Sequence, residues 1–222
     1  MSEQERRERI ARSINTLHAY QDIQNEMGRV VAAFNYRQAD KILERFALHL
    51  DDVSLEYADE GLFRGPDAVE TIVRETVGRT PRPGEMYDVH LTTPVIEVAE
   101  DEQTAKAIWW APGAASLLDE NAEPSAVWMW GTIAADFIRV DDSWLIYHLH
   151  YFTVIKSSYD KGWVEDTDLV HRANTPLHPK AQSSTHHNPY TPTSVRDALP
   201  AVPRPYADYD GPGWMLERDK TK

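Results

Sequence analysis

The stretch VWMWGTIAADFIRVDDSWLIYHLHYFTVI, residues 127–155, decides the fold class of this chain. Apolar side chains alternate with others along both halves, which is the period of a β-strand, and the sequence Asp-Asp-Ser between the halves is a turn signal. We therefore predict strands at 127–140 and 144–155. Because the connection between them is so short, the two strands are expected to pair antiparallel as a hairpin.

Upstream of this hairpin, the sequence changes from a helical to a strand period. Three segments with apolar side chains at helical spacing come first, at 5–35 with an interruption near Gly28, at 38–48 and at 66–77. Shorter elements lie between and after them: strands at 53–57, 87–98 and 104–111, a glycine-bounded turn at 61–65 and a loop at 112–124. This order predicts an α+β fold, in which three N-terminal helices pack on a curved, mostly antiparallel sheet.

The last part of the chain differs in composition from the rest. Eight of the fourteen prolines fall beyond residue 156, which is typical of extended chain. The same segment holds aromatic side chains that are costly to leave in water: Trp163, Tyr190, Tyr206, Tyr209 and Trp214. We predict a domain of residues 1–156 and an arm of residues 157–222 that packs on the body or on a neighbouring subunit, with a mobile tail as the alternative.

Charge and composition exclude several classes of protein. The formal net charge is −13, from 23 Lys and Arg against 36 Asp and Glu, so binding to nucleic acids or anionic membranes is not expected. The chain has no cysteine, which excludes disulfides and thiolate metal sites. No stretch has the length and apolarity of a membrane span, and we expect a cytoplasmic protein. Nucleotide-binding motifs are absent and His186 and His187 lack a third ligand, so neither a cofactor nor a metal is predicted.

Four phrases of the sequence resemble the nuclear transport factor 2-like superfamily, in particular its SnoaL-like and scytalone dehydratase-like members. They are VVAAFN at 30–35, VSLEY at 53–57, GLFRGPDAV at 61–69 and DSWLIYHLH at 142–150. The resemblance covers residues 14–155. It implies a cone-shaped α+β barrel whose sheet wraps a deep apolar pocket for a small molecule, and a homo-oligomer formed through the outer face of the sheet.

The resemblance also implies catalytic residues. Tyr57 and His90 fall where scytalone dehydratase has a catalytic tyrosine and a histidine acid/base. Asp59 and His150 fall where limonene epoxide hydrolase has a water-holding asparagine and an aspartate base. Asp136 falls near the oxyanion-stabilising aspartate of ketosteroid isomerase. These five positions are the predicted catalytic residues.

Further side chains are predicted to contact the substrate. Alternation places His148 and His150 on one strand face with Phe152, where imidazoles are costly unless used or hydrogen-bonded, so satisfied core histidines are the alternative. Trp128 and Trp130 share a face of the preceding strand and form either an aromatic wall or ordinary core or interface. Asn35 and Tyr36 fall near the helix-borne polar groups of scytalone dehydratase and complete the predicted substrate-binding set, which also includes His148 and Phe152.

Taken together, these observations favour a cofactor-independent lyase. We expect a dehydratase, or a dehydrating C–C lyase releasing formaldehyde, acting on a hydrophobic aromatic molecule such as a lignin-derived diaryl compound. His150 and His90 would move protons, Tyr57 would donate a hydrogen bond, and Asp136 or Asp59 would orient them. Two alternatives stay open: a polyketide cyclase or ketone isomerase with the same proton chemistry, and a non-catalytic module that binds a ligand or a partner.

Overall fold

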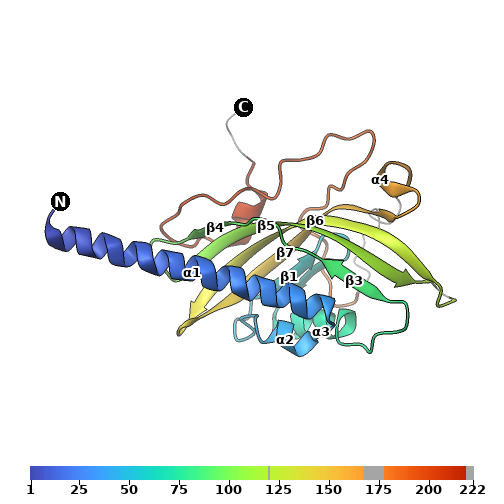
Figure 1. Ribbon diagram of the computed structural model, residues 1–222, viewed down its shortest axis with the longest axis horizontal. Helices are drawn as coiled ribbons and strands as arrows, with labels where there is room; N and C mark the ends of the chain where they lie inside the picture. The colour runs from blue at the N-terminus through green and yellow to red at the C-terminus, as the bar shows by residue number, and fades with distance from the viewer. Residues whose placement is uncertain (120, 168–177, 219–222) are drawn as a thin grey trace.

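The computed structural model describes residues 1–119, 121–167 and 178–218 (Figure 1). It has an α+β fold built on one curved sheet of seven strands, in the order β2-β1-β7-β6-β5-β3, with β4 also paired to β5. Strands β1 and β7 run parallel, and the other neighbouring pairs are antiparallel. The sheet is open rather than closed into a barrel. Parts of the predicted arm, 168–177 and 219–222, lie outside the described residues.

Three helices precede or interrupt the first strands: α1 (Glu3–Asn35), α2 (Ala39–Leu43) and α3 (Pro66–Thr76). Helix α1 begins with a capping box between Ser2 and Glu5. It runs through Gly28 without a break, so the predicted interruption is wrong. A single glycine costs a helix only about 1 kcal/mol, and the buried side chains of Ile23, Met27 and Val30 hold this helix on the core.

Helix α2 is shorter than the predicted 38–48 because the chain turns toward the sheet. Phe46 forms a bridge with Ile146, and the Ala47 amide donates to the Ile146 carbonyl at 2.8 Å. These contacts place the end of the segment against β7. The helix therefore ends at Leu43, and three helices form, although one is only five residues long.

The strands are more numerous than predicted, and the last three are longer than predicted. They are β1 (Ser54–Tyr57), β2 (Gly61–Arg64), β3 (Met86–Val89), β4 (Val95–Val98), β5 (Thr104–Leu118), β6 (Pro124–Val140) and β7 (Ser143–Ser158). The predicted turn at 61–65 is strand β2, and the predicted strand at 87–98 is divided into β3 and β4. The predicted loop at 112–124 is also wrong, since β5 and β6 stay paired from Thr104 to Leu118.

The two faces of the sheet are covered by different parts of the chain. Figure 1 shows α2 and α3 on one side and most of the C-terminal segment on the other. This segment, residues 178–218, adds Gln182 to the edge of β2 opposite Leu62. Its 3₁₀ helix η2 (Pro212–Leu216) buries Trp214 and Met215 against the sheet. We call the helix-covered side the inner face and the other side the outer face. Among the described residues, no helix is long and apolar enough to cross a membrane.

Candidate functional site

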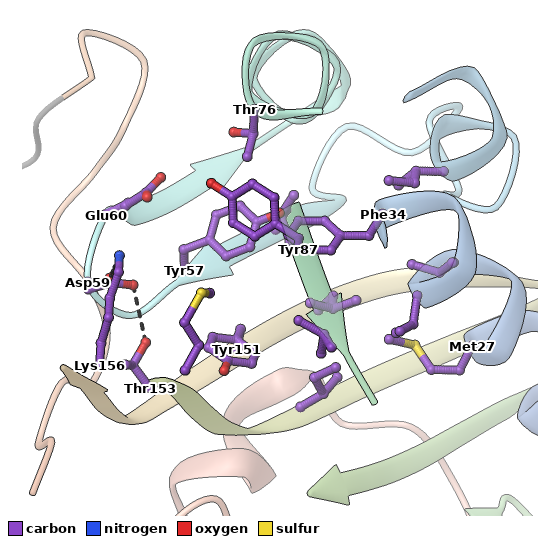
Figure 2. A pocket seen from close by; sticks show the side chains of 18 of the residues that line it. Met27, Phe34, Tyr57, Asp59, Glu60, Thr76, Tyr87, Tyr151, Thr153 and Lys156 are labelled. Carbon is purple, nitrogen blue, oxygen red and sulfur yellow. Dashed lines mark hydrogen bonds and ion pairs between the residues drawn. The ribbon is translucent and has the colours of Figure 1, made fainter. Parts of the chain in front are cut away.

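An interior cavity of about 140 Å³ lies between the helices and the inner face of the sheet. Most of its wall is apolar, from α1 and the central strands: Met27, Val30, Phe34, Leu55, Ile133 and Leu149. Figure 2 shows the polar side chains of this cavity gathered toward one end. A small, partly open space with an apolar wall and a few convergent polar groups is the usual form of a small-molecule site.

The parallel pairing of β1 and β7 brings the polar groups together. Tyr57 and Tyr151 are register partners and therefore lie on the same face of the sheet. Asp59 follows β1 two residues later, and Thr153 follows Tyr151 by the same interval, so both continue along this face. All four side chains line the cavity together with Lys156.

A buried ion pair forms the polar end of the cavity. Lys156 Nζ lies 2.9 Å from Asp59 Oδ2, and Thr153 Oγ1 donates to Asp59 Oδ1 at 3.1 Å. The side chains of Lys156 and Asp59 are only 22% and 10% exposed. Burial lowers the pKa of Lys156, but attraction to Asp59 and a hydrogen bond with it outweigh burial and raise that pKa overall. The lysine is therefore held as an ammonium group at the cavity wall.

Glu60 stands beside this ion pair and also lines the cavity. Burial raises the pKa of its carboxyl group, and the charge of Asp59 raises it further, against a lowering by Lys156. A carboxylate with a raised pKa is a stronger base than an ordinary one. Glu60 thus has the properties of a proton acceptor, whereas Asp59 is engaged in fixing Lys156.

Two tyrosines provide hydrogen-bond donors. Burial raises the pKa values of Tyr57 and Tyr151, so both phenols keep their protons. The Tyr151 hydroxyl is fully buried and has no hydrogen-bond partner among the described residues. Its ring lies over Gly131, where a Cβ atom would come within 2.5 Å of Tyr151 Cζ. The glycine thus makes room for a buried tyrosine whose hydroxyl is left without a hydrogen-bond partner among the described residues.

His150, predicted to be catalytic, and His148, predicted to bind the substrate, lie on the outer face instead. In the parallel register, His148 pairs with Ser54 and His150 with Glu56, one residue out of step with Tyr57. Tyr57 and His150, which were predicted to act in one site, therefore lie on opposite faces of the sheet, and the prediction that they act together is wrong. The alternation along β7 was predicted correctly. The face of β7 that lines the cavity, however, carries Leu149, Tyr151 and Thr153.

The outer-face histidines make structural contacts beneath the C-terminal segment. His148 Nδ1 is hydrogen-bonded to Ser54 Oγ at 2.9 Å, and burial lowers the pKa of His148 to about 4. The His150 ring stacks on Phe152 with centroids 3.6 Å apart, and burial lowers its pKa strongly. Its Nε2 lies 3.4 Å from Oε1 of Glu56. His148 is therefore a hydrogen-bonded core histidine, as the alternative proposed, whereas Nε2 of His150 is buried without a hydrogen-bond partner among the described residues.

Glu56 and Asp136 anchor the C-terminal segment to this outer face. Glu56 accepts hydrogen bonds from the backbone amide of Thr185 at 2.6 Å and from its hydroxyl at 2.8 Å. Asp136 is completely buried and accepts hydrogen bonds from Trp214 Nε1 at 2.6 Å and Tyr209 Oη at 2.9 Å. Burial raises the pKa of Asp136 to about 7. The predicted catalytic role of Asp136 is thus not supported by its position, which is outside the cavity.

The remaining predicted residues also lie away from the cavity. His90 is exposed and pairs with Asp88 at 3.2 Å. Asn35 exchanges hydrogen bonds with the backbone of Val89 at 2.9 and 3.0 Å, which ties α1 to β3. Three aromatic residues lie on the surface or against other surface rings: Tyr36 is exposed, Trp128 packs on Tyr159, and Trp130 stacks on Trp163. Of the predicted catalytic set, Tyr57 and Asp59 line the cavity.

Sequence reasoning missed Tyr151, Glu60 and Lys156. The signal that could have revealed Tyr151 is strand pairing, because a parallel neighbour of β1 must place one of its side chains beside Tyr57. No group of three His, Asp or Glu side chains capable of holding a metal occurs in the part of the chain that the structure describes. The arrangement instead combines a base, an ammonium group and two phenols around an apolar space.

Comparison with known proteins assigns this fold to a family. The model of the SnoaL-like domain matches residues 15–150, and the chain belongs to this family. The match ends before the predicted arm. In the comparison with curated proteins, none matches.

Solved structures with the nuclear transport factor 2-like fold resemble the chain at low identity. A putative scytalone dehydratase from Novosphingobium aromaticivorans has a TM-score of 0.56 and 16% identity, over 66% of this chain and 91% of that one. A type 2 hexachlorocyclohexane dehydrochlorinase, LinA, has a TM-score of 0.53 and 14% identity, over 66% and 92%. LinA-type3 from Novosphingobium barchaimii has a TM-score of 0.54 and 15% identity, over 66% and 93%. At such identities the likeness concerns the fold alone.

Proposed function

We propose that this protein is a cofactor-independent lyase that catalyses an elimination on a compact hydrophobic molecule in the inner cavity. The observation that carries the proposal is the polar end of that cavity, where Lys156, Glu60 and the unpartnered hydroxyl of Tyr151 meet an apolar wall. An apolar ring would occupy the wall, and an oxygen substituent would face the tyrosine. The names dehydratase and dehydrochlorinase, carried by proteins of similar fold, both denote eliminations.

Each polar side chain of the cavity has its own role in the proposed elimination. Glu60 takes a proton from the carbon beside the leaving group, and the electron pair of that C–H bond forms the new C=C bond. The hydroxyl leaves with a proton supplied through Tyr57 or Tyr151, so the products are an alkene and water, and the Glu60 proton returns to the tyrosine. Lys156, oriented by Asp59, stabilises negative charge on oxygen as it develops. General acid or base groups contribute roughly 10²- to 10⁴-fold each.

The volume of the cavity limits the size of the substrate. At about 140 Å³, it is close to the roughly 150 Å³ of an engineered cavity that admits benzene. A single six-membered ring therefore fits the cavity as it stands. A lignin-derived diaryl compound has two rings and exceeds this volume, so single-ring alcohols are the better first choice.

A panel of substrates tests the proposal. The purified protein would be incubated with cyclic β-hydroxy ketones, single-ring benzylic alcohols and diaryl propanediols, and products would be followed by mass and by the absorbance of the new conjugated double bond. We expect the parent protein to remove one water from a single-ring compound. The rate of this reaction should be at least about 100-fold lower in Glu60→Gln and in Lys156→Met. His90→Ala, an exposed residue outside the cavity, serves as the control and should leave the rate unchanged. Equal rates in the two cavity variants and the parent would overturn the assignment.

Ketone isomerisation is the second proposal, because two phenols beside one base also suit the stabilisation of an enolate. The same panel separates the two reactions. An isomerase returns a product of unchanged mass, whereas a dehydratase returns one lighter by a water. If the protein is a binding module without catalysis, a compound of the panel should raise its unfolding temperature, and no compound should be converted.

A further inference from the structure

The polar end of the inner cavity depends on one short turn. Asp59 and Glu60 lie in the turn that joins β1 to β2 (Figure 2). These two strands have four residues each, and β2 is the outermost strand on this side of the sheet. A hairpin of two short strands is only marginally stable by itself. The position of Asp59 and Glu60 is therefore set by what packs against the hairpin.

The C-terminal segment adds a bridge to the free edge of this hairpin. Gln182 and Leu62 exchange backbone hydrogen bonds, at 2.8 Å from the Gln182 amide and at 3.0 Å from the Leu62 amide. The Gln182 carbonyl oxygen lies so close to the turn that a Cβ atom at Gly61 would come within 2.6 Å of it. Gly61 also has a φ of +119°, a conformation that side chains rarely adopt. The turn therefore ends in a glycine that lets the segment approach its backbone.

Two polar side chains of the segment hold the first half of the hairpin. Ser184 Oγ donates to the Ala58 carbonyl at 2.7 Å, whereas the hydroxyl and the amide of Thr185 both donate to the Glu56 carboxylate. Glu56 and Ala58 are only 4% and 1% exposed, so little water competes for these bonds. On its other side, Ala58 donates from its amide to the Tyr151 carbonyl at 3.1 Å. The backbone at Ala58 is thus held between β7 and the C-terminal segment.

The positions that the segment holds alternate with positions that line the cavity. Glu56 and Ala58 contact the segment, whereas Tyr57 and Asp59 line the cavity, followed by Glu60. Neighbouring residues of an extended chain are joined by stiff backbone about 3.3 Å long, so a shift of the outward positions also moves the inward ones. Misplacement of a reacting group by about 1 Å can lower a rate by about 10²-fold. Contacts on the outer side of the hairpin can therefore decide how well Glu60 reaches a substrate.

We propose that Ser184 and Thr185, with the backbone of Gln182, are positioning residues that hold Asp59 and Glu60 in place at the inner cavity. None of the three lines the cavity, so they act through the backbone of the turn. This inference rests on the proposed elimination for its effect on rate. The family model matches residues 15–150, so this support comes from outside the matched domain. The C-terminal segment thus serves the cavity in addition to covering the outer face.

Steady-state rates of the double variant Ser184→Ala/Thr185→Val test this role in the full chain. The variant loses both hydroxyl donors and keeps the backbone bridge of Gln182. We expect kcat on the substrate found by the panel to fall by about 10-fold or more, with KM nearly unchanged because the apolar wall is intact. Thr185→Ser keeps a hydroxyl for Glu56 and should behave as the parent. Thr191→Val removes a hydroxyl that donates to Ser194 elsewhere in the segment, and it should also leave kcat unchanged.

Two further measurements on the double variant do not depend on turnover. Amide hydrogens of residues 58–62 should exchange with solvent about 10-fold faster than in the parent, because the turn opens more often. The pKa of the Glu60 carboxyl group, followed by NMR, should fall toward its ordinary value, because a displaced turn lets water reach a group whose pKa is raised by burial. Thr191→Val should change neither measurement.

These measurements separate the inference from the proposed function. A parent protein that converts no compound of the panel would remove the elimination, but exchange at the turn and the pKa of Glu60 would still decide whether the segment positions it. No change in either of them in the double variant would overturn the inference. Faster exchange with the kcat and the Glu60 pKa of the parent would also overturn it, because the contacts would then stabilise the turn without placing Glu60.

Discussion

Replacement of Tyr151 by phenylalanine should make the protein more stable and less active. The hydroxyl of Tyr151 is buried at the cavity without a hydrogen-bond partner among the described residues. A buried polar group left unsatisfied costs about 1–3 kcal/mol. Tyr151→Phe removes that group and keeps the ring, so we expect the free energy of unfolding to rise by about 1–2 kcal/mol. For a chain of this size, that corresponds to an increase in Tm of roughly 2–8 °C.

The same change should lower turnover on the substrate found by the panel by about 10²-fold, since a donor to the leaving oxygen is lost. Thermal unfolding and steady-state rates would be measured on the same preparations. Tyr147→Phe is the matched control, because Tyr147 lies on the same strand but donates to Asp52 Oδ1 at 2.6 Å on another part of the molecule. It should lower stability slightly and leave the rate unchanged. A Tyr151→Phe variant that loses stability and keeps full activity would refute the reasoning.

The structure yields three further predictions. Gly131→Ala should destabilise the protein by about 1–3 kcal/mol, because the added Cβ would meet Tyr151 Cζ at 2.5 Å and the Phe152 carbonyl oxygen at 2.7 Å. Urea unfolding measures this loss, which should be the same in the parent and in Tyr151→Phe, since phenylalanine keeps Cζ. Burial raises the pKa of Asp136 to about 7 from its ordinary 3.8, so folding takes up a proton at this group and its contribution to stability falls as pH rises from about 4 to 7. In Asp136→Asn this contribution should vanish from urea unfolding measured across that range, and a pH profile equal to that of the parent would contradict it. Thr185→Val removes the hydroxyl that donates to Glu56; limited proteolysis should cut the C-terminal segment faster than in the parent, and equal rates would show that this contact does not hold it.

The pH profile of the parent protein combines opposing groups. His148 has its pKa lowered to about 4 from 6.5, so folding releases a proton there and stability rises with pH over that interval. Asp136 acts in the opposite direction between about 4 and 7. The comparison of parent with Asp136→Asn isolates the aspartate, since His148 is common to both.

Much of the fold could be predicted from local sequence. The hairpin of β6 and β7 is evident from alternation, and α1 and α3 from helical spacing. The predicted loop at 112–124 failed because the run Ala-Pro-Gly-Ala-Ala-Ser at 111–116 contains two residues typical of turns and has too little contrast in hydrophobicity to show a period of two. Long-range pairing with β6 extends the strand through these small residues.

The site could be predicted only in part, since both faces of β7 are buried. Tyr57 and Asp59 were identified through the family resemblance, because the phrase VSLEY at 53–57 places Tyr57 at the end of β1 and Asp59 two residues beyond it. The histidines were placed on the wrong face because a strand covered on both sides carries large side chains on each, and alternation alone cannot tell which side has the cavity. The cover over His148 and His150 comes from the C-terminal segment, including Thr185, far along the chain.

The central claim is that chemistry takes place in the inner cavity and not beside the outer-face histidines. A crystal structure of the protein with phenol, a single ring with one hydroxyl, tests it most directly. The account predicts the ring within the apolar wall near Ile133 and its oxygen within hydrogen-bonding distance of Tyr151 Oη or Lys156 Nζ. Phenol bound beside His148 or His150 beneath the C-terminal segment, with the inner cavity unoccupied, would contradict it.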